Sequence, residues 1–196
     1  MHIKNISIFC GAHEGTNPNY KKAAIEVANI ISSKKIGIVF GGGDVGLMKV
    51  VSDVGIENKV DVLGISLKSL HALELVNPKL TRLEVAETLL DRKQIFMDNS
   101  DAFIVLPGGV GSLDELAEIM ASNQLGIINK PIGLLNTDGY YDHLIGWMKH
   151  AVNEGFISQA NYDDLIIEHE PDVLIDRIIS SKRPEDENWK QRLGLG

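Results

Sequence analysis

Short apolar runs alternate with amphipathic helical segments from one end of the chain to the other. The apolar runs are nearly continuous, which is typical of parallel strands that are buried on both faces of a sheet. We predict strands over residues 3–10, 36–40, 60–67, 80–85, 102–106, 131–135 and 165–168. We predict helices over residues 17–33, 45–54, 88–99, 113–124, 141–154 and 172–180, with Thr88 as a helix N-cap. This order predicts an α/β fold: a Rossmann-like, doubly wound, mostly parallel sheet covered by helices on both faces.

Length and cysteine content limit the kind of protein that this chain can be. Its 196 residues suit one nucleotide-binding domain over residues 1–181, followed by a polar C-terminal tail over residues 182–196. No apolar run approaches the roughly 20 residues that span a bilayer, so we expect no membrane partner. The N-terminus resembles a strand rather than a signal peptide, and Cys10 is the single cysteine. We therefore expect a cytoplasmic protein in which Cys10 is a small buried hydrophobe.

The charge of the chain argues against one class of partner and leaves another open. The net charge is −8, whereas proteins that bind nucleic acid usually carry a basic face. One turn of backbone N–H groups can nevertheless bind a small phosphate in an acidic protein. The six histidines form no metal-spaced cluster, so we expect no metal and no cofactor.

The first glycine-rich turn, Gly41-Gly42-Gly43-Asp44-Val45-Gly46, contains the pattern G-x-G-x-x-G. A dinucleotide site would have this pattern after the first strand and an acidic residue at the tip of the next one. Here it follows the second strand, and the next strand ends at Ile65-Ser66-Leu67-Lys68, so an NAD-dependent oxidoreductase is poorly supported. The glycines can serve a tight turn with positive φ. Three in a row exceed that need and indicate that backbone approaches a ligand closely.

The second glycine-rich turn, Pro107-Gly108-Gly109-Val110-Gly111-Ser112, is a candidate phosphate cradle. Its backbone N–H groups can converge, the following helix adds partial positive charge, and Ser112 adds a hydroxyl donor. Ser112 and Glu115 also have the S-x-x-E spacing of a capping box, so Glu115 is either a cap or a catalytic carboxylate. Asp114 lies about 100° around the helix from Glu115, which favours a solvated acid.

Arg92 and Lys93 lie on the helix before the strand that leads to the second turn. They are either a surface pair, or Arg92 reaches over the strand ends towards the ligand. A guanidinium can hold a phosphate or hydrogen-bond a base.

These motifs together resemble the LOG family, the cytokinin riboside 5′-monophosphate phosphoribohydrolases that were long labelled lysine decarboxylases. The resemblance runs from about residue 6 to residue 157. The motifs that carry it are Phe9-Cys10-Gly11, Asn17-Pro18-Asn19-Tyr20, Gly41 to Met48, Asp91-Arg92-Lys93-Gln94, Pro107 to Glu115, Gln124-Leu125-Gly126, Lys130 to Asn136 and Asp138-Gly139-Tyr140-Tyr141. An R-K pair on a helix followed by P-G-G-x-G-T-x-x-E is highly specific.

The resemblance implies an N-glycosidase, similar to an AMP nucleosidase. It would hydrolyse an adenosine 5′-monophosphate, often N6-substituted, to the free base and ribose 5-phosphate. Arg92 and Glu115 would be the catalytic pair, and Lys93 and Glu74 would help to bind the nucleotide. The remaining substrate-binding residues would be Gly41, Gly42, Gly43, Met48, Gly108, Gly109, Val110, Gly111 and Ser112. The family implies a homodimer with the site near its interface.

Three positions depart from the family pattern. Ser112 replaces the usual Thr and keeps the hydroxyl, and Lys49 replaces a common glycine. Ala121-Ser122-Asn123 stands where Thr-Trp-Ala is usual, and loss of the aromatic would reshape the site. This last change leaves open a non-catalytic nucleotide- or phosphate-binding protein of the same fold. The decarboxylase label has little support, because a pyridoxal enzyme needs a Schiff-base lysine with an acidic partner for the ring nitrogen.

Overall fold

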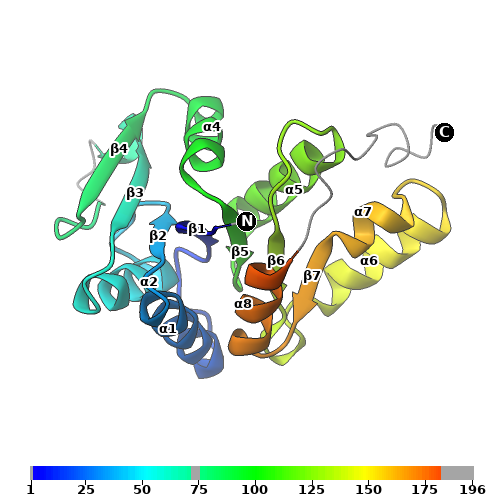
Figure 1. The fold of residues 1–196 in the computed structure, drawn as a ribbon, viewed down its shortest axis with the longest axis horizontal. Coiled ribbons are helices and arrows are strands. Elements are labelled where there is room, and N and C mark those ends of the chain that lie inside the picture. The colour runs from blue at the N-terminus through cyan, green and yellow to red at the C-terminus, as the bar shows by residue number, and fades with distance from the viewer. Residues whose placement is uncertain (1, 72–75, 182–196) are drawn as a thin grey trace.

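The computed structural model describes residues 2–71 and 76–181, so Glu74 and the tail over residues 182–196 lie outside the described residues. Within the described part of the chain, seven strands form one sheet in the order β4-β3-β2-β1-β5-β6-β7 (Figure 1). The strands are β1 (Asn5–Phe9), β2 (Gly37–Phe40), β3 (Val62–Leu67), β4 (Arg82–Ala86), β5 (Ala102–Val105), β6 (Ile132–Leu135) and β7 (Leu165–Glu168). Every pair of neighbouring strands is parallel, which confirms the predicted α/β fold. The sheet was predicted to be mostly parallel, and among the described strands it is entirely so.

Helices cover both faces of this sheet. The predicted helices correspond to α1 (Pro18–Ser33), α2 (Gly46–Glu57), α4 (Leu89–Asn99), α5 (Val110–Gln124), α6 (Asp142–Asn153) and α8 (Pro171–Ser180). Three short elements lack a periodic signal and were not predicted: α3 (Lys68–His71), the 3₁₀ turn η1 (Thr137–Gly139) and α7 (Gln159–Asp163). Over the described residues, no helix combines the length and the apolar character that crossing a membrane requires.

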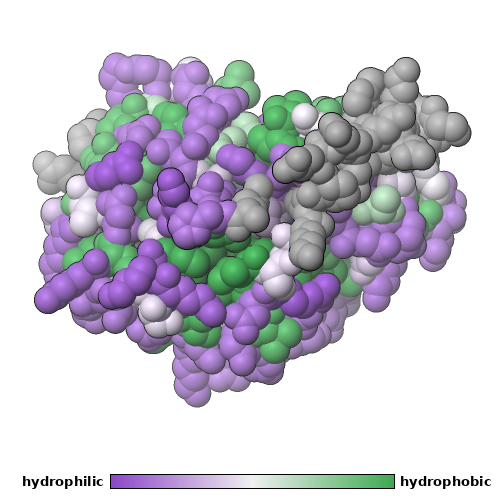
Figure 2. All heavy atoms as spheres, viewed as in Figure 1, coloured by the Kyte–Doolittle hydropathy of each residue, from purple (hydrophilic) through white to green (hydrophobic). Residues whose placement is uncertain are grey.

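The strands are apolar throughout because each is buried on both sides. In β5, Ile104 packs with α1, α2 and α8 on one face, whereas Phe103 and Val105 pack with α4, α5 and α6 on the other. Figure 1 shows these two groups of helices on opposite sides of the sheet. Figure 2 shows hydrophilic residues over most of the visible surface. The continuous apolar runs of the sequence are thus the strands of a sheet between two helical layers.

The strand order reverses between β1 and β5, and this reversal positions a crevice. The chain adds β2, β3 and β4 on one side of β1, then returns to place β5, β6 and β7 on the other. In open parallel sheets, ligands bind at such a switch point, outside the carboxyl ends of the strands. Phe9 pairs with Val105 at those ends, and the N–H of Gly11 donates to the carbonyl of Pro107 at 3.1 Å. The loop after β1 and the second glycine-rich turn therefore meet at the crevice.

Helix α5 begins three residues earlier than the sequence pattern predicts. Its N-cap is Gly109, with no side-chain cap, so Ser112 occupies the N3 position and is not the N-cap. The predicted capping box of Ser112 and Glu115 is therefore wrong. A capping box does exist at α4, where Thr88 and Asp91 exchange side-chain and backbone hydrogen bonds, which confirms Thr88 as the N-cap. The S-x-x-E spacing did not identify the N-cap, because a serine and a glutamate can have the same spacing inside a helix that begins at a glycine.

Candidate functional site

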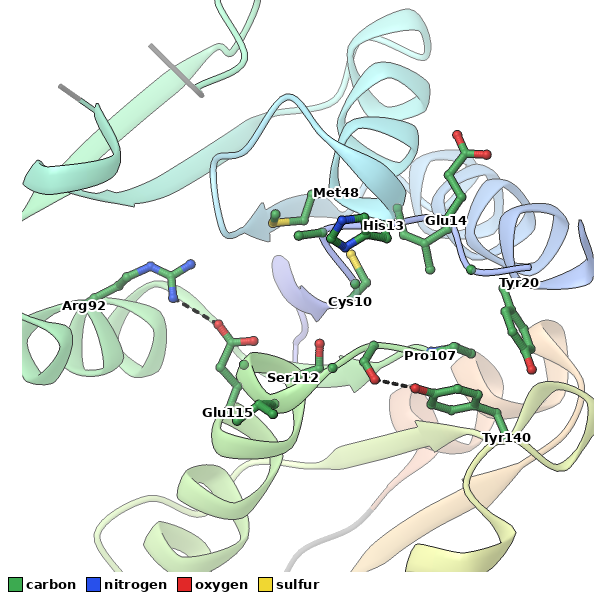
Figure 3. Close-up of a pocket in the computed structure, with 18 residues that line it drawn as sticks. Cys10, His13, Glu14, Tyr20, Met48, Arg92, Pro107, Ser112, Glu115 and Tyr140 are labelled. Atoms are coloured by element: carbon green, nitrogen blue, oxygen red, sulfur yellow. Dashed lines mark hydrogen bonds and ion pairs between the residues drawn. The ribbon is translucent and has the colours of Figure 1, made fainter. Parts of the chain in front are cut away.

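A cavity of about 510 Å³ opens at the carboxyl ends of β1 and β5 (Figure 3). It is lined by the loop after β1, the start of α2, Arg92 of α4, the turn over residues 107–112, Glu115 of α5 and Tyr140. Its volume lies within the roughly 300–1,000 Å³ of small-ligand pockets. Elements from five βα units therefore meet at the switch point that the topology selects.

The second glycine-rich turn forms one wall of the cavity and begins helix α5. The first N–H groups of a helix have no carbonyl partner within it, so they are available to an anion. A Cβ added at Gly109 or Gly111 would meet nothing within 4 Å, which leaves open space in front of this backbone. Gly108 differs, because its Cβ would lie 2.1 Å from Ser112 Oγ. Gly109 and Gly111 thus leave room for a ligand, and Gly108 leaves room for Ser112.

Arg92 projects from α4 across the strand ends, and its side chain is only 12% exposed. Its Nε donates to the carbonyl of Ile65 at 2.9 Å, Nη2 to the carbonyl of Gly41 at 3.4 Å, and Nη1 to Glu115 Oε1 at 3.1 Å. The guanidinium lies 4.9 Å from the ring centre of Phe96. Three of its five N–H donors are thereby engaged, which leaves two for a ligand. The surface-pair interpretation is wrong for Arg92.

Glu115 faces Arg92 inside the cavity, and its side chain is 13% exposed (Figure 3). Burial raises the pKa of Glu115 to about 7, although the charge and hydrogen bond of Arg92 act in the opposite direction. Asp114 adds a smaller increase to this pKa. Near neutral pH, Glu115 therefore exists in both protonation states, which is a property of many catalytic carboxyls. Glu115 pairs with an arginine rather than capping α5.

Lys93 and Asp114 form a separate pair beside the cavity. Lys93 Nζ lies 2.9 Å from Asp114 Oδ1 and 3.3 Å from Glu118 Oε2. The hydrogen bond that Lys93 donates to the Asp114 carboxylate is the main cause that raises the pKa of Lys93. Lys93 is not among the residues that line the cavity, and Asp114 is paired rather than simply solvated. The geometry therefore does not bring Lys93 to the place that the family resemblance implies.

The first glycine-rich turn lies behind the cavity wall rather than in it. A Cβ at Gly41 would lie 2.8 Å from both Arg92 Nη2 and Met48 Sδ, and one at Gly43 would lie 2.8 Å from Met48 Cε. Gly42 has φ +78°, which favours glycine. The close approach expected here does occur, but the approaching atoms belong to protein side chains. Of the four residues predicted from this turn, Met48 lines the cavity.

Four further lining residues had no role assigned from the sequence, and two of them, His13 and Glu14, lie in no motif. Tyr20 and Tyr140, which belong to motifs of the family resemblance, lie at the end of the cavity away from Arg92 (Figure 3), and His13 and Glu14 follow β1. The only available signal was the position of the loop after β1 at a switch point, which requires the strand order. Cys10 also lines the cavity and is buried as predicted. Burial and the charge of Glu115 raise the pKa of this thiol, so it is a poor nucleophile.

The altered segment over residues 121–123 lies at the far end of α5 from the cavity. Ser122 and Asn123 are buried there, and Asn123 exchanges hydrogen bonds of 2.9 and 3.0 Å with the backbone of Lys130. None of these residues lines the cavity. The expectation that this departure reshapes the site is therefore not supported within this chain, because the segment supports the loop before β6 instead.

The chain resembles proteins of known family over most of its length. A family profile described as "Possible lysine decarboxylase" matches residues 48–178. A cytokinin riboside 5′-monophosphate phosphoribohydrolase from Arabidopsis thaliana is 43% identical over 156 residues, which cover 80% of this chain and 72% of that protein. A probable enzyme of the same name from Oryza sativa subsp. japonica is 37% identical and covers 90% and 70% of the two chains.

Solved structures share the fold at lower identity. A molybdenum cofactor binding protein from Rippkaea orientalis has a TM-score of 0.69 and 23% identity, and covers 92% of this chain and 98% of that one. The molybdenum cofactor carrier protein from Chlamydomonas reinhardtii has a TM-score of 0.70 and 14% identity, and covers 92% and 100%. At such identities the likeness concerns the fold alone.

Proposed function

Because the chain belongs to the LOG family of cytokinin riboside 5′-monophosphate phosphoribohydrolases, we propose that it hydrolyses the N-glycosidic bond of an N6-substituted adenosine 5′-monophosphate. The products are the free base and ribose 5-phosphate. We assign the reaction to particular residues on one observation. The buried pair of Arg92 and Glu115 faces a turn of free backbone N–H groups across one cavity. An anion site and a carboxylate–guanidinium pair are what a phosphorylated glycoside requires.

The 5′-phosphate is assigned to the turn over residues 108–112. Its N–H groups and the positive end of α5 attract an anion, and Gly109 and Gly111 leave the approach open. The ribose and base then extend towards Arg92 and Glu115, past Met48. Gly41, Gly42, Gly43 and Lys93 act indirectly, by accommodating Arg92 and Met48 and by holding Asp114.

Glycosidic cleavage passes through a state with positive charge on the ribose. The carboxylate of Glu115 stabilises that charge and orients a water molecule towards C1′. The water oxygen forms the new bond to C1′, the electrons of the broken bond go to the base nitrogen, and the proton that the water loses neutralises the departing base. The two unengaged N–H donors of Arg92 stabilise negative charge on the departing purine.

The direct test is a base-release assay. Purified protein is incubated with AMP and with isopentenyladenosine monophosphate, and the free base is measured by chromatography. We expect release from at least one substrate, and a loss of about a thousandfold or more in Glu115→Gln and in Arg92→Ala. Saturable AMP binding by calorimetry without any release would instead identify the non-catalytic binding protein.

The pH dependence of the assay tests the state in which Glu115 acts. A carboxylate that stabilises positive charge must be ionised, so kcat should rise as the pH increases through the Glu115 pKa of about 7. A rate that falls over the same range would assign Glu115 to proton donation.

The description as a possible lysine decarboxylase does not fit the cavity. A pyridoxal enzyme needs a lysine that reaches the cofactor, and the described residues that line the cavity include no lysine. Lys93, the nearest one in the sequence motif, is bound to two carboxylates. Incubation with lysine and pyridoxal phosphate should therefore yield no cadaverine.

A homodimer through the α4 and α5 side is part of the proposal. Large apolar side chains are exposed where these helices begin and after α5 ends: Leu89, Leu90, Val110, Leu113, Leu125 and Ile127. Figure 2 shows hydrophobic residues at the upper edge, over α5 and the connection after it. Exposed apolar clusters mark interfaces more often than free surface.

Analytical ultracentrifugation tests the dimer. We expect a dimer for the wild type and a monomer for Leu90→Asp, because Leu90 is 73% exposed on α4. Phe156→Asp, on the connection between α6 and α7, is the matched control and should stay dimeric. A monomeric wild type would refute the assembly and leave the site assignment intact. The cytoplasmic location stays a prediction, which cell fractionation would test.

A further inference from the structure

Two adjacent tyrosines after β6 reach the backbone of the second glycine-rich turn. The hydroxyl of Tyr140 donates to the carbonyl of Gly108 at 2.5 Å (Figure 3), and that of Tyr141 donates to the carbonyl of Leu106 at 2.7 Å. These residues belong to the motif Asp138-Gly139-Tyr140-Tyr141, to which the proposed reaction mechanism assigns no role. Each bond joins segments more than 30 residues apart, so the contacts are tertiary rather than local.

Between the carbonyls of Leu106 and Gly108 lies the carbonyl of Pro107, which also accepts a hydrogen bond. The carbonyl of Pro107 accepts from the N–H of Gly11 at 3.1 Å. Three consecutive carbonyls of the turn are thus held by other parts of the chain. In a planar trans peptide, the carbonyl and the following N–H point in opposite directions. Holding the carbonyls of Pro107 and Gly108 therefore fixes the directions of the N–H groups of Gly108 and Gly109.

The tyrosines are themselves held in place. Their rings lie edge to face with centres 4.8 Å apart, and the ring of Tyr20 packs edge to face on Tyr140 at 5.3 Å. The N–H of Tyr141 donates to Asn136 Oδ1 at 2.7 Å. Burial raises the pKa of the Tyr141 hydroxyl, which keeps it protonated and able to donate. These contacts form a rigid support behind the turn.

A second set of contacts anchors this support to α1. The carboxylate of Asp138 accepts from Asn17 Nδ2 at 2.7 Å and from Asn19 Nδ2 at 2.8 Å. Asp138 has φ +50°, in the left-handed region that aspartate tolerates better than most non-glycine residues. The segment that carries the tyrosines is therefore fixed at the helix that follows β1 as well as at β6.

We propose that Tyr140 and Tyr141 are positioning residues that hold the turn in its phosphate-binding shape and thereby make the site selective for substrates with a 5′-phosphate. The inference rests on the proposed placement of the phosphate at residues 108–112. Tyr141 carries it most clearly, because its side chain is 6% exposed and is not among the cavity-lining residues. Its hydroxyl meets the backbone at two points, the carbonyl of Leu106 and the N–H of Gly108, and it can affect a ligand only through them.

The test compares binding of AMP and adenosine by calorimetry to Tyr141→Phe, Tyr140→Phe and the wild type. Loss of either hydroxyl should weaken AMP binding about fivefold and leave adenosine binding unchanged. Tyr162→Phe is the matched control, since Tyr162 lies on α7, packs against the core and does not line the cavity, and it should change neither affinity. Thermal unfolding of each variant accompanies the titrations. If Tyr141→Phe fails to fold, Tyr140→Phe carries the same prediction from a more exposed position.

Equal losses for AMP and adenosine, or unchanged AMP binding in two folded variants, would overturn the inference. It would also be overturned by a wild type that binds AMP no more tightly than adenosine, because the phosphate would then lie elsewhere. A wild type that prefers AMP but releases no base would refute the proposed hydrolysis only. The AMP-specific loss in the tyrosine variants would then still support the inference.

Discussion

The two glycine-rich turns have similar composition and opposite surroundings. The turn at residues 41–46 follows β2 and is filled by protein: Arg92 and Met48 occupy the space that side chains at Gly41 and Gly43 would need. The turn at residues 107–112 follows β5 and is open at Gly109 and Gly111. The first receives a guanidinium from within the chain, and the second is proposed to receive a phosphate from outside.

Arg92 connects the two turns. It donates to the carbonyl of Gly41 in the first and pairs with Glu115 on the helix that begins in the second. The comparison shows that a glycine run indicates close approach without identifying what approaches. Only the partner atoms, which tertiary structure supplies, distinguish a site for a side chain from a site for a ligand.

Among the variants that distinguish the two turns, the largest effect is expected at Gly109. A methyl group there meets no protein atom within 4 Å but enters the space in front of the N–H groups. Gly109→Ala should weaken AMP binding about a hundredfold while the melting temperature stays unchanged. Gly108→Ala is the contrasting variant: its methyl would lie 2.1 Å from Ser112 Oγ, so its melting temperature should fall. Wild-type AMP affinity in Gly109→Ala would show that the open space is not the phosphate site.

The next effect concerns the pair of Arg92 and Glu115, and the quantity that it changes is the free energy of unfolding. The folded-state pKa of Glu115 is raised to about 7 from an ordinary 4.5, so the folded protein binds this proton more tightly than the unfolded chain. Stability is therefore full below about pH 4.5 and is lost as the pH rises through 7. Glu115→Gln should exceed the wild type by roughly 2 kcal/mol in free energy of unfolding at pH 8.

Urea unfolding of Glu115→Gln and wild type at pH 4 and pH 8 measures this difference. At pH 4 the two proteins should have nearly equal stability, because Glu115 is then protonated in both the folded and the unfolded state. An equal difference at both pH values would mean that ionisation of Glu115 is not its cause.

A smaller effect is expected at the first turn. The methyl group of Gly41→Ala would lie 2.8 Å from Arg92 Nη2, so the guanidinium must move. We expect kcat to fall about tenfold with little change in AMP affinity, because the second turn is untouched. Gly146→Ala, on α6 with nothing within 4 Å, is the control and should keep full activity. A selective loss of AMP affinity in Gly41→Ala would assign this turn to the ligand after all.

The smallest expected effect concerns N-capping, in which α4 and α5 differ. Thr88 caps α4, which carries Arg92, so Thr88→Ala should lower the free energy of unfolding by about 1 kcal/mol. Ser112 is at N3 of a helix that Gly109 begins, so Ser112→Ala removes no cap. Chemical unfolding of both variants decides the point: an equal or larger loss in Ser112→Ala would restore its capping role.

The sequence predicted the parts of this molecule that depend on local pattern. Seven strands and six helices follow from apolar runs and from 3.6-residue periodicity, and Thr88 from its cap spacing. The start of α5 was misplaced because Ser112 and Glu115 match a capping box while lying inside the first turn. The arginine that fills the space at Gly41 lies 51 residues away, so no local pattern could name it.

In the candidate site, too, some residues could be predicted from sequence motifs, whereas others depend on tertiary contacts. Arg92 and Glu115 were predicted through family motifs, and the structure brings them to 3.1 Å of each other, while their catalytic roles stay predictions. The sequence motif that contains Tyr141 gives it no role, because its hydrogen bond to Leu106 joins residues 35 positions apart. His13 had no signal, since its place depends on the reversal of strand order.

The central position of β1 sets the order in which this protein can be built. The first strand of the chain pairs with β5, and Ser7 Oγ meets Ser100 Oγ at 2.6 Å across 93 residues. During synthesis, β1 therefore has one edge unpaired until β5, more than 90 residues later, has left the ribosome. Tyr140 follows Gly108 by 32 residues, so the cavity walls are complete later still. Such long-range closure slows folding and exposes an apolar strand edge meanwhile.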